Sequence, residues 1–330
     1  MSKLRWTTFP CSEIECCGLP WYQETLPNLW RFPPKAEAVV RERVWHISMF
    51  PCGGRLRMRC NTSRLVLRNQ SMQAKGGLDI YVDGKFWRTV SLSGTGETEE
   101  TICFEITSAN AREMKDIDIY LPIRQRMQLT EVGVDDDTLF EKPSAFRNSK
   151  PFVLYGSSVA QGIGSARPGM SYAAILSRTL GLDYVNLGFG GNGKAEPEVV
   201  SLVSEIDACC YILDLGKSYG WQTPKPYANM VMTLRKDHPD VPIICITPIF
   251  ASREIYTDYT GVSEHTRNAM REAVQQLIAA GDSRLVLIEG LDLLSERDTD
   301  GFSGDGVHPS DYGFAIIAER LRPVLESLIF

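Results

Sequence analysis

The residues best suited to chemistry lie in four short stretches of the second half of the chain. These stretches are GSSVAQG from Gly156, NLGFGGNG from Asn186, DLGKSYG from Asp214 and DGVHP from Asp305. Together they offer hydroxyl groups, glycine-rich backbone amides, an imidazole and a carboxylate. Acyl transfer through a covalent serine needs these parts. The sequence therefore predicts a serine nucleophile served by a histidine.

The spacing of Asp305 and His308 supports this prediction. Residues three apart in a helical turn or tight loop face the same side, so the carboxylate can hold one nitrogen of the imidazole. The other ring nitrogen then faces the serine and can accept its proton. The chain has four histidines, and none of the other three has a carboxylate in comparable register within a glycine-rich loop. We therefore expect His308 to be the base and Asp305 to orient it.

The elements that must position these residues follow from the periodicity of the second half. Short apolar runs alternate with segments of helical period, and the runs are FVLY, DYVNL, ACCYILDL, VPIICIT and RLVLIE. Five near-continuously apolar strands joined by helices predict a parallel sheet covered on both faces, a doubly wound α/β domain. Functional groups of such a sheet collect beyond the carboxyl ends of its strands, so the four stretches should open on one edge.

The first half has a different period. Between about residues 44 and 132, apolar and polar residues alternate in the runs VWHISMF, RLRMRC, RLVLR, LDIYVDGKFW, TICFEI and DIDIYL. Asp83-Gly84 is a type I′ hairpin signal, because both central residues of that turn need φ > 0. Six or seven short strands predict an all-β sandwich. The first 40 residues have no clear period. We predict two domains, 1–148 and 149–330.

Composition excludes several classes of function. The net charge is −6 and no basic run is present, which argues against nucleic-acid binding. No signal-peptide h-region and no run of 18 apolar residues are found, so neither secretion nor a membrane span is expected. The nine cysteines lack metal-binding or redox spacing and read as reduced thiols of a cytoplasmic protein. We expect a small-molecule partner, no metal or cofactor, and no predicted oligomer.

In their order and spacing, the four stretches resemble the four blocks of the SGNH or GDSL-type hydrolases, over about residues 151–330. The alignment places the nucleophile at Ser158 and puts Ser157 at the usual aspartate position, where it shapes the turn. The resemblance implies a three-layer αβα, flavodoxin-like domain. It also implies an oxyanion hole formed by the backbone amides of Ser158 and Gly191 and by an asparagine side chain from the third block.

The third block departs from the family pattern, because Ser218 stands at the asparagine position. Losing one well-placed oxyanion donor can lower turnover by about 10²–10³-fold. Either Ser218, Lys217 or a water fills the role, or activity is weaker or directed elsewhere; the first alternative is favoured because the other three blocks are intact. Lys217 and Arg167 would bind a carboxylate or sugar hydroxyl in a pocket, but surface exposure is the expectation for both.

A sandwich ahead of such a domain, here jelly-roll-like, resembles bimodular members of the family, and residues 166–198 look similar to that subgroup. Its members include carbohydrate acetyl esterases and acyltransferases acting on natural products. The resemblance implies a serine esterase, a deacetylase of small O-acyl esters that include acylated carbohydrates. One alternative is an acyltransferase that passes the acyl group to an alcohol. Another is a glycan-binding protein whose hydrolase domain is degenerate.

Overall fold

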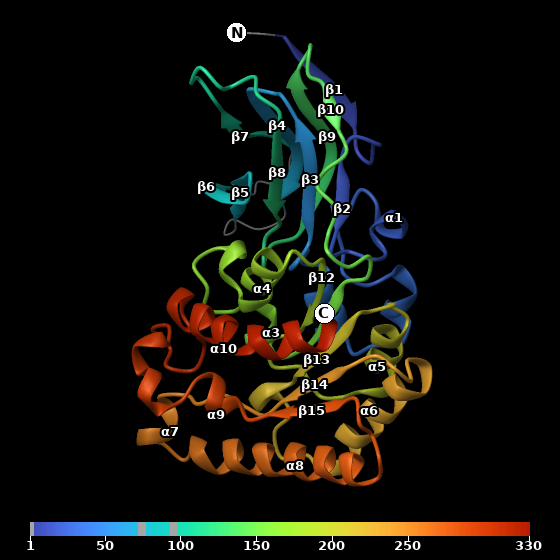
Figure 1. Cartoon of the computed structure of the whole chain (residues 1–330), viewed down its shortest axis with the longest axis vertical. Helices are drawn as coiled ribbons and strands as arrows, with labels where there is room; N and C mark the ends of the chain where they lie inside the picture. Colours follow the sequence, from blue (N-terminus) through green and yellow to red (C-terminus); the bar gives the residue numbers. More distant parts are fainter. Residues whose placement is uncertain (1–2, 72–76, 93–97) are drawn as a thin grey trace. The chain divides into compact units, whose positions relative to one another are not determined.

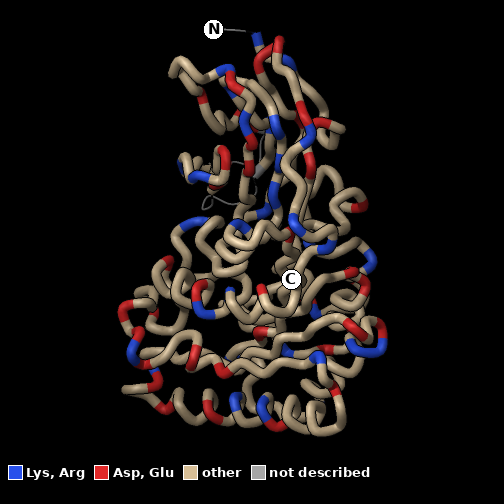
Figure 2. Tube along the Cα trace, viewed as in Figure 1, with Lys and Arg blue, Asp and Glu red and all other residues tan. Residues whose placement is uncertain are grey.

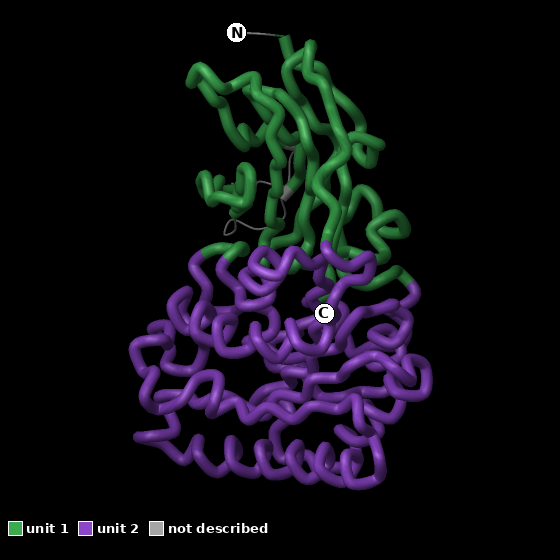
Figure 3. Tube along the Cα trace, viewed as in Figure 1, with its two compact units in different colours: residues 1–34, 48–146, 167–169 green, residues 35–47, 147–166, 170–330 purple. Residues whose placement is uncertain are grey.

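The computed structural model describes residues 3–71, 77–92 and 98–330, and its contacts divide the chain into two compact units (Figure 3). Unit 1 comprises Met1–Pro34, Ser48–Phe146 and Arg167–Gly169, and unit 2 comprises Lys35–Ile47, Arg147–Ala166 and Met170–Phe330. The chain therefore passes from one unit to the other five times. That residues 1–148 act as a separate substrate-binding domain stays a prediction.

Unit 1 is an antiparallel sandwich of two sheets, as the alternating runs predict. The first sheet has the order β1 (Leu4–Thr8), β9 (Met127–Asp135), β4 (Arg64–Ser71) and β7 (Thr98–Glu105). The second has the order β10 (Phe140–Glu141), β3 (Arg55–Cys60), β8 (Lys115–Tyr120), β5 (Gly77–Val82) and β6 (Lys85–Ser91), with β2 (Glu15–Cys17) beside β3. Alternate side chains of both sheets, such as Leu56, Leu67 and Ile119, fill the core between them.

Charged side chains on the sandwich pair across neighbouring strands, and Figure 2 shows both signs interspersed along the trace. Arg57 Nε lies 2.8 Å from Asp118 Oδ1 across the β3–β8 pair, and Arg68 Nη1 lies 2.6 Å from Glu131 Oε2 across β4–β9. Such cross-strand pairs stabilise a sheet by roughly 0.2–1 kcal/mol each. These arginines are therefore engaged within the sandwich.

Two local predictions for the first half have opposite outcomes. The hairpin between β5 and β6 is confirmed, because Asp83 and Gly84 both have positive φ, 49° and 72°. The strand predicted for VWHISMF is wrong, since this run lies largely in the helix α2 (Glu42–Ser48). Val40, Val44 and Ile47 are buried at helical spacing, whereas the alternation that suggested a strand is that of Trp45, Ile47 and Met49 with the polar His46 and Ser48. The unassigned N-terminal residues form β1, β2, α1 (Tyr22–Thr25) and the 3₁₀ helix η1 (Pro34–Ala38).

Unit 2 contains the predicted five-stranded parallel sheet with helices on both faces (Figure 1). Its order is β12 (Tyr184–Gly188), β11 (Phe152–Gly156), β13 (Cys210–Asp214), β14 (Ile243–Ile246) and β15 (Leu285–Ile288). One layer holds α4 (Tyr172–Leu180) and α10 (Asp311–Ile329), and the other holds α5 (Pro197–Ser204), α6 (Pro224–Asp237) and α8 (Tyr259–Ala279). This strand order, 2-1-3-4-5, is the flavodoxin-like one, and the αβα fold prediction is confirmed.

The first motif stretch runs into the short helix α3 (Ser158–Gln161) and the third into the 3₁₀ helix η3 (Gly216–Ser218), whereas the second and fourth lie outside helices. Other short elements of the second half are η2 (Pro168–Met170), α7 (Arg253–Tyr256), α9 (Gly290–Leu293) and η4 (Glu296–Gly301). The strand order reverses between β11 and β13, whose ends are joined where Ser157 N donates to Asp214 O over 2.8 Å. A reversal of this kind opens a crevice for ligands, and the first and third stretches meet there.

Across the described ranges 3–71, 77–92 and 98–330, no helix is long and apolar enough to cross a membrane. Nor does this part of the chain bring together three or more His, Cys, Asp or Glu side chains that could hold a metal ion. None of the nine cysteines, all of which lie in the described ranges, is joined in a disulfide. Burial raises the pKa of the Cys103 thiol to about 12, so this group stays protonated and unreactive at neutral pH.

Candidate active site

The turn after β11 presents Ser158 at the start of a helix. Gly156 must be glycine, because a Cβ there would stand 1.9 Å from Asp214 O on the neighbouring strand. Ser157 then caps α3, and its Oγ accepts a hydrogen bond from Val159 N over 3.2 Å. The prediction that Ser157 shapes the turn is confirmed. The hydroxyl of Ser158 is thereby left for other partners.

The structure brings together the three predicted side chains, although Ser158 and His308 are 150 residues apart. His308 Nε2 lies 2.8 Å from Ser158 Oγ, and His308 Nδ1 lies 2.6 Å from Asp305 Oδ2. Asp305 is fixed by its own loop, because its Oδ1 accepts hydrogen bonds from the backbone N–H groups of Val307 and His308 over 2.9 and 3.0 Å. The imidazole is therefore held between hydroxyl and carboxylate.

The surroundings of Asp305 keep its carboxyl group ionised. Partial burial opposes ionisation, but hydrogen bonds from the backbone and ring of His308 and from Val307 N outweigh it and hold the pKa of Asp305 well below its usual range. An ionised carboxylate can only accept a hydrogen bond, so the proton of a neutral His308 belongs on Nδ1. The lone pair on Nε2 then faces the Ser158 hydroxyl.

Backbone N–H groups beside Ser158 suit the stabilisation of an oxyanion. Gly191 has φ of 71°, and a Cβ built on it would meet nothing within 4 Å. A Cβ built on Gly190 would stand 3.6 Å from Ser158 Cβ, and Gly190 donates its own N–H to Gln161 Oε1 over 2.9 Å. Among the described residues, the N–H groups of Ser158 and Gly191 meet no hydrogen-bond acceptor. Both amides are thus available to a ligand, and Asn192 closes the turn by donating to Gly190 O.

The third block forms η3, and its residues contact two different parts of unit 2: the Ser157 turn and the segment around Ile249 and Glu254. Gly216 packs against the Ser157 turn, because a Cβ at this position would stand 2.8 Å from Ser157 Oγ. Ser218 carries a hydroxyl that bonds to no residue in the described part of the chain, and its role in the oxyanion hole stays a prediction. Lys217 Nζ instead donates to Ile249 O over 2.5 Å and pairs with Glu254 over 3.2 Å. Its amine is committed elsewhere and does not replace the asparagine.

Both basic residues that were expected on the surface are largely buried, so that prediction is wrong. Only 11% of the Lys217 side chain is exposed. Arg167 belongs to unit 1, where its Nη1 lies 2.8 Å from Asp79 Oδ2 and 3.0 Å from Tyr81 Oη and its guanidinium stacks on Phe86. A single basic residue in a loop gives no sign of partners so far away in the sequence. The residues next to Lys217 and Arg167 in the sequence therefore could not predict the partners of either side chain.

Sequence reasoning missed Asp214, the last residue of β13. This carboxyl is buried beside Gly216 and accepts a hydrogen bond from Tyr172 Oη over 2.9 Å. Burial raises the pKa of Asp214 to about 6, against the opposing effects of Tyr172 and Lys217. A signal was present, since a carboxylate at the end of the apolar run CYILD needs a buried partner. Asp214 supports the loop that carries Ser218.

A comparison with models of protein families identifies the family of this chain. Residues 149–326 match the model of the GDSL-like lipase/acylhydrolase family. The chain belongs to this family. Residues 4–140 match a second model, described as the N-terminus of the SGNH-hydrolase-type esterases. The predicted resemblance to an SGNH or GDSL hydrolase preceded by a β-sandwich is therefore confirmed for both halves of the chain.

Solved structures agree with this family over the whole chain. A protein of Bacteroides ovatus that carries the name GDSL-like lipase has 26% identity and a TM-score of 0.82, covering 99% of this chain and 98% of that one. The salicylyl-acyltransferase SsfX3 of a tetracycline biosynthetic pathway has 23% identity and a TM-score of 0.85, covering 98% and 97%. A family two carbohydrate esterase of Cellvibrio japonicus has 14% identity and a TM-score of 0.69, covering 100% and 99%. The last two likenesses show the fold alone. Among curated proteins, no sequence matches the chain.

Proposed function

We propose that this GDSL-family protein is a serine esterase in which Ser158, His308 and Asp305 act together. One observation carries the proposal: Ser158 Oγ, His308 Nε2, His308 Nδ1 and Asp305 Oδ2 form a continuous chain with contacts of 2.8 and 2.6 Å. These are the distances at which a base can take a hydroxyl proton. The family adds independent support, because its description is that of acylhydrolases.

The proposed reaction has two halves. Ser158 Oγ attacks the ester carbonyl while His308 Nε2 takes the hydroxyl proton, and the oxyanion that forms accepts hydrogen bonds from the N–H groups of Ser158 and Gly191. His308 then returns the proton to the departing alcohol, which leaves an acyl group on Ser158. Water then attacks the acyl carbonyl carbon while His308 takes one of its protons. The bond between the acyl carbon and Ser158 Oγ breaks, His308 returns the proton to Ser158 Oγ, and a carboxylic acid leaves.

We propose small O-acyl esters as substrates, with acetyl groups on a carbohydrate as the first class to test. Support comes from the neighbours, which include family two carbohydrate esterases and an acetyl xylan esterase of Butyrivibrio proteoclasticus with a TM-score of 0.67. The shared arrangement of sandwich and hydrolase domain favours related chemistry.

The test compares the wild type with Ser158→Ala on a chromogenic acetate ester and on an acetylated oligosaccharide. Removing the nucleophile should lower kcat at least about 10³-fold, because no acyl-enzyme can then form. A fluorophosphonate should label the wild type at Ser158, located by mass spectrometry of the digested protein, and should leave the variant unlabelled. Equal rates in the two proteins would remove Ser158 from the mechanism. Failure of every ester tried, together with binding in a glycan titration, would favour the glycan-binding alternative.

Acyl transfer is the second candidate function, and one observation favours it. Over nearly the whole length of both chains the fold matches that of an acyltransferase, SsfX3. The same acyl-enzyme would then be attacked by an alcohol in place of water, and exclusion of water from the closed site decides which acceptor wins. Product analysis with and without added alcohol separates the two. A new ester formed in preference to the acid would identify a transferase.

A further inference from the structure

A cluster of four charged side chains, the Glu254 cluster, lies behind the third block in unit 2. It consists of Lys217 on η3, Glu254 on α7, and Glu264 and Arg267 on α8. Arg267 Nη1 lies 2.9 Å from Glu254 Oε2 and its Nη2 lies 3.0 Å from Glu254 Oε1, while Lys217 Nζ lies 3.2 Å from Glu254 Oε1. Glu254 therefore binds two cations from two different elements.

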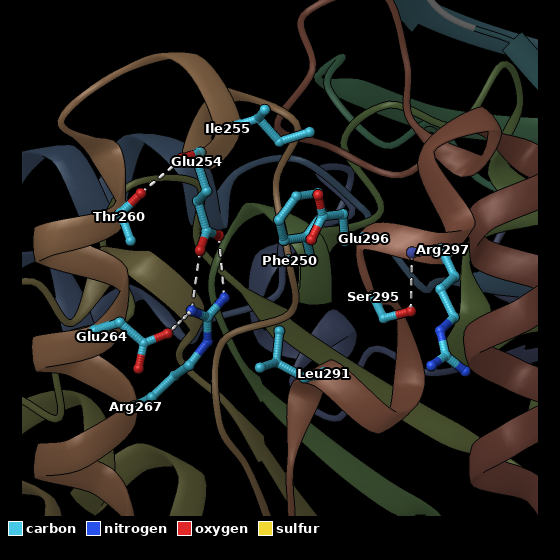
Figure 4. A pocket seen from close by; sticks show the side chains of 10 residues that line it. All are labelled: Phe250, Glu254, Ile255, Thr260, Glu264, Arg267, Leu291, Ser295, Glu296 and Arg297. Atoms are coloured by element: carbon cyan, nitrogen blue, oxygen red, sulfur yellow. Dashed lines mark hydrogen bonds and ion pairs between the residues drawn. The ribbon is translucent and has the colours of Figure 1, made fainter.

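Figure 4 shows the Arg267 guanidinium facing Glu254, with the Glu264 carboxylate beside it, near the same Nη1. Glu254 and Arg267 are buried, with side chains 5% and 1% exposed, whereas Glu264 is half-exposed. Two cations and two carboxylates balance in charge. Removing the Glu254 charge would leave Arg267 and Lys217 close together without their shared counter-charge.

The short helix that carries Glu254 also holds the acid loop. Arg253, the residue before Glu254, donates from Nε to Asp305 O over 3.1 Å and from its backbone N–H to Gly306 O over 3.4 Å. Asp305 is the carboxylate that orients His308. The route from the third block to the acid loop thus runs through Lys217, Glu254 and Arg253.

Ion pairs, rather than packing, must place this helix. α7 has four residues, too few to be stable alone, and none of its side chains is fully removed from solvent. A cavity of about 530 Å³ lies beside it, lined by Phe250, Glu254, Ile255, Arg267 and Leu291 among others. With this cavity on one side, α7 is fixed by the ion pairs of Glu254, by the hydrogen bond from Thr260 Oγ1 to Glu254 O, and by the bonds of Arg253 to the acid loop.

We infer that Glu254 is a positioning residue of the active site: it ties the loop of Ser218 to the loop of Asp305 and so keeps oxyanion donor and acid in register. Glu254 does not touch Ser158 or His308, so its effect must pass through Lys217 and Arg253. The inference rests on the proposed function. A misplacement of about 1 Å at reacting groups can lower turnover by about 10²-fold.

The test measures kcat and KM for a chromogenic ester, the rate of fluorophosphonate labelling of Ser158, and Tm. Glu254→Gln keeps the shape of the side chain and removes its charge. We expect kcat and the labelling rate to fall about tenfold, with KM within about twofold, because the substrate contacts are intact. Glu264→Gln is the matched control, since it removes a carboxylate from the same Arg267 but touches neither Lys217 nor α7; kcat should stay within about twofold.

Lys217→Met and the double variant complete the experiment. If both residues act on one path, the loss in kcat of the double variant should be smaller than the product of the two single losses. Equal kcat in Glu254→Gln and Glu264→Gln, or a fall in Tm alone, would overturn the inference. Should Glu254→Gln fail to fold, Lys217→Met decides, and a wild-type kcat there would also overturn it.

Failure of the proposed function is a separate result. An active Ser158→Ala variant would refute the esterase mechanism, whatever Glu254→Gln does. An inactive Ser158→Ala variant beside a fully active Glu254→Gln variant would leave the mechanism standing and refute only the positioning role.

Discussion

The two sides of Ser158 differ in how completely they are built. On the acid side, His308 and Asp305 are held by short contacts, and the loop itself supplies two N–H groups to Asp305. On the donor side, the predicted donors are the N–H groups of Ser158 and Gly191 and the hydroxyl of Ser218, and these groups have no hydrogen-bond partner among the described residues. In the proposed mechanism, the groups that move the proton are therefore already joined to one another, whereas the groups predicted to stabilise the oxyanion are not held by such contacts. The acid side should therefore tolerate substitution least.

Substituting the acid should have the largest effect. In Asp305→Asn the amide can present an N–H to His308 and favour the wrong tautomer, so we expect kcat for an ester to fall about 10³–10⁴-fold. KM should change little, because Asp305 does not contact substrate. Steady-state kinetics at pH 7 measures this, with Asp311→Asn as a control carboxylate on α10. A loss smaller than about tenfold would mean that the acid side is less decisive than its geometry indicates.

Substitutions on the donor side should change kcat less, and the two substitutions of Ser218 should change kcat in opposite directions. Ser218→Ala removes the hydroxyl and should lower kcat by about 10-fold, while Ser218→Asn restores the two-donor amide of the family pattern and should raise it by a similar factor. Pre-steady-state measurements of the acylation rate of each variant, with the same ester, test both expectations. If the alanine variant matches the wild type, the hydroxyl takes no part and the oxyanion relies on the amides alone.

The smallest expected effect is on the free energy of unfolding, through the buried carboxyl of Asp214, which precedes the loop of Ser218. The folded-state pKa of Asp214 is raised to about 6, above the value of 3.8 in an unfolded chain. The protonated carboxyl is favoured in the folded state below about pH 4, and this stabilisation is lost as pH rises through 6. Asp214→Asn avoids the buried charge and can still accept from Tyr172. We expect it to gain about 3 kcal/mol over the wild type at pH 7.5 and almost nothing at pH 4.

Urea unfolding of both proteins at the two pH values tests this expectation. Other titrating groups are the same in wild type and variant, so the difference between them isolates Asp214. A gain of equal size at both pH values would show that the carboxyl is not buried in its charged form.

The sequence predicted those site residues whose neighbours in the chain already indicate their position, and it missed contacts between residues far apart in the chain. Gly156, Ser158, Asp305 and His308 lie directly after strands or in one short loop, so their order along the chain already implied one edge of a parallel sheet. The partners of Lys217 are different. Glu254 follows 37 residues later in a helix of only four residues, and no local period announces that contact.

The same distinction explains the errors in the first half. The Asp83-Gly84 turn is a two-residue signal, and the structure confirms it. VWHISMF is seven residues long. Over that length the alternation of Trp45, Ile47 and Met49 with polar residues fits a strand, while the burial of Val44 and Ile47, three residues apart, fits a helix. Burial against unit 2, which decides between them, is information that no short window of the sequence contains.

The repeated passage of the chain between its two units bears on any attempt to dissect the protein. A fragment beginning at residue 149 would lack α2, which is counted in unit 2, and would strip Arg167 of Asp79. A fragment ending at residue 148 would leave Asp79 buried with no arginine to neutralise it. One cut in the gene thus cannot yield two intact halves, and loss of activity in either fragment would report damage to folding before it reported the division of labour.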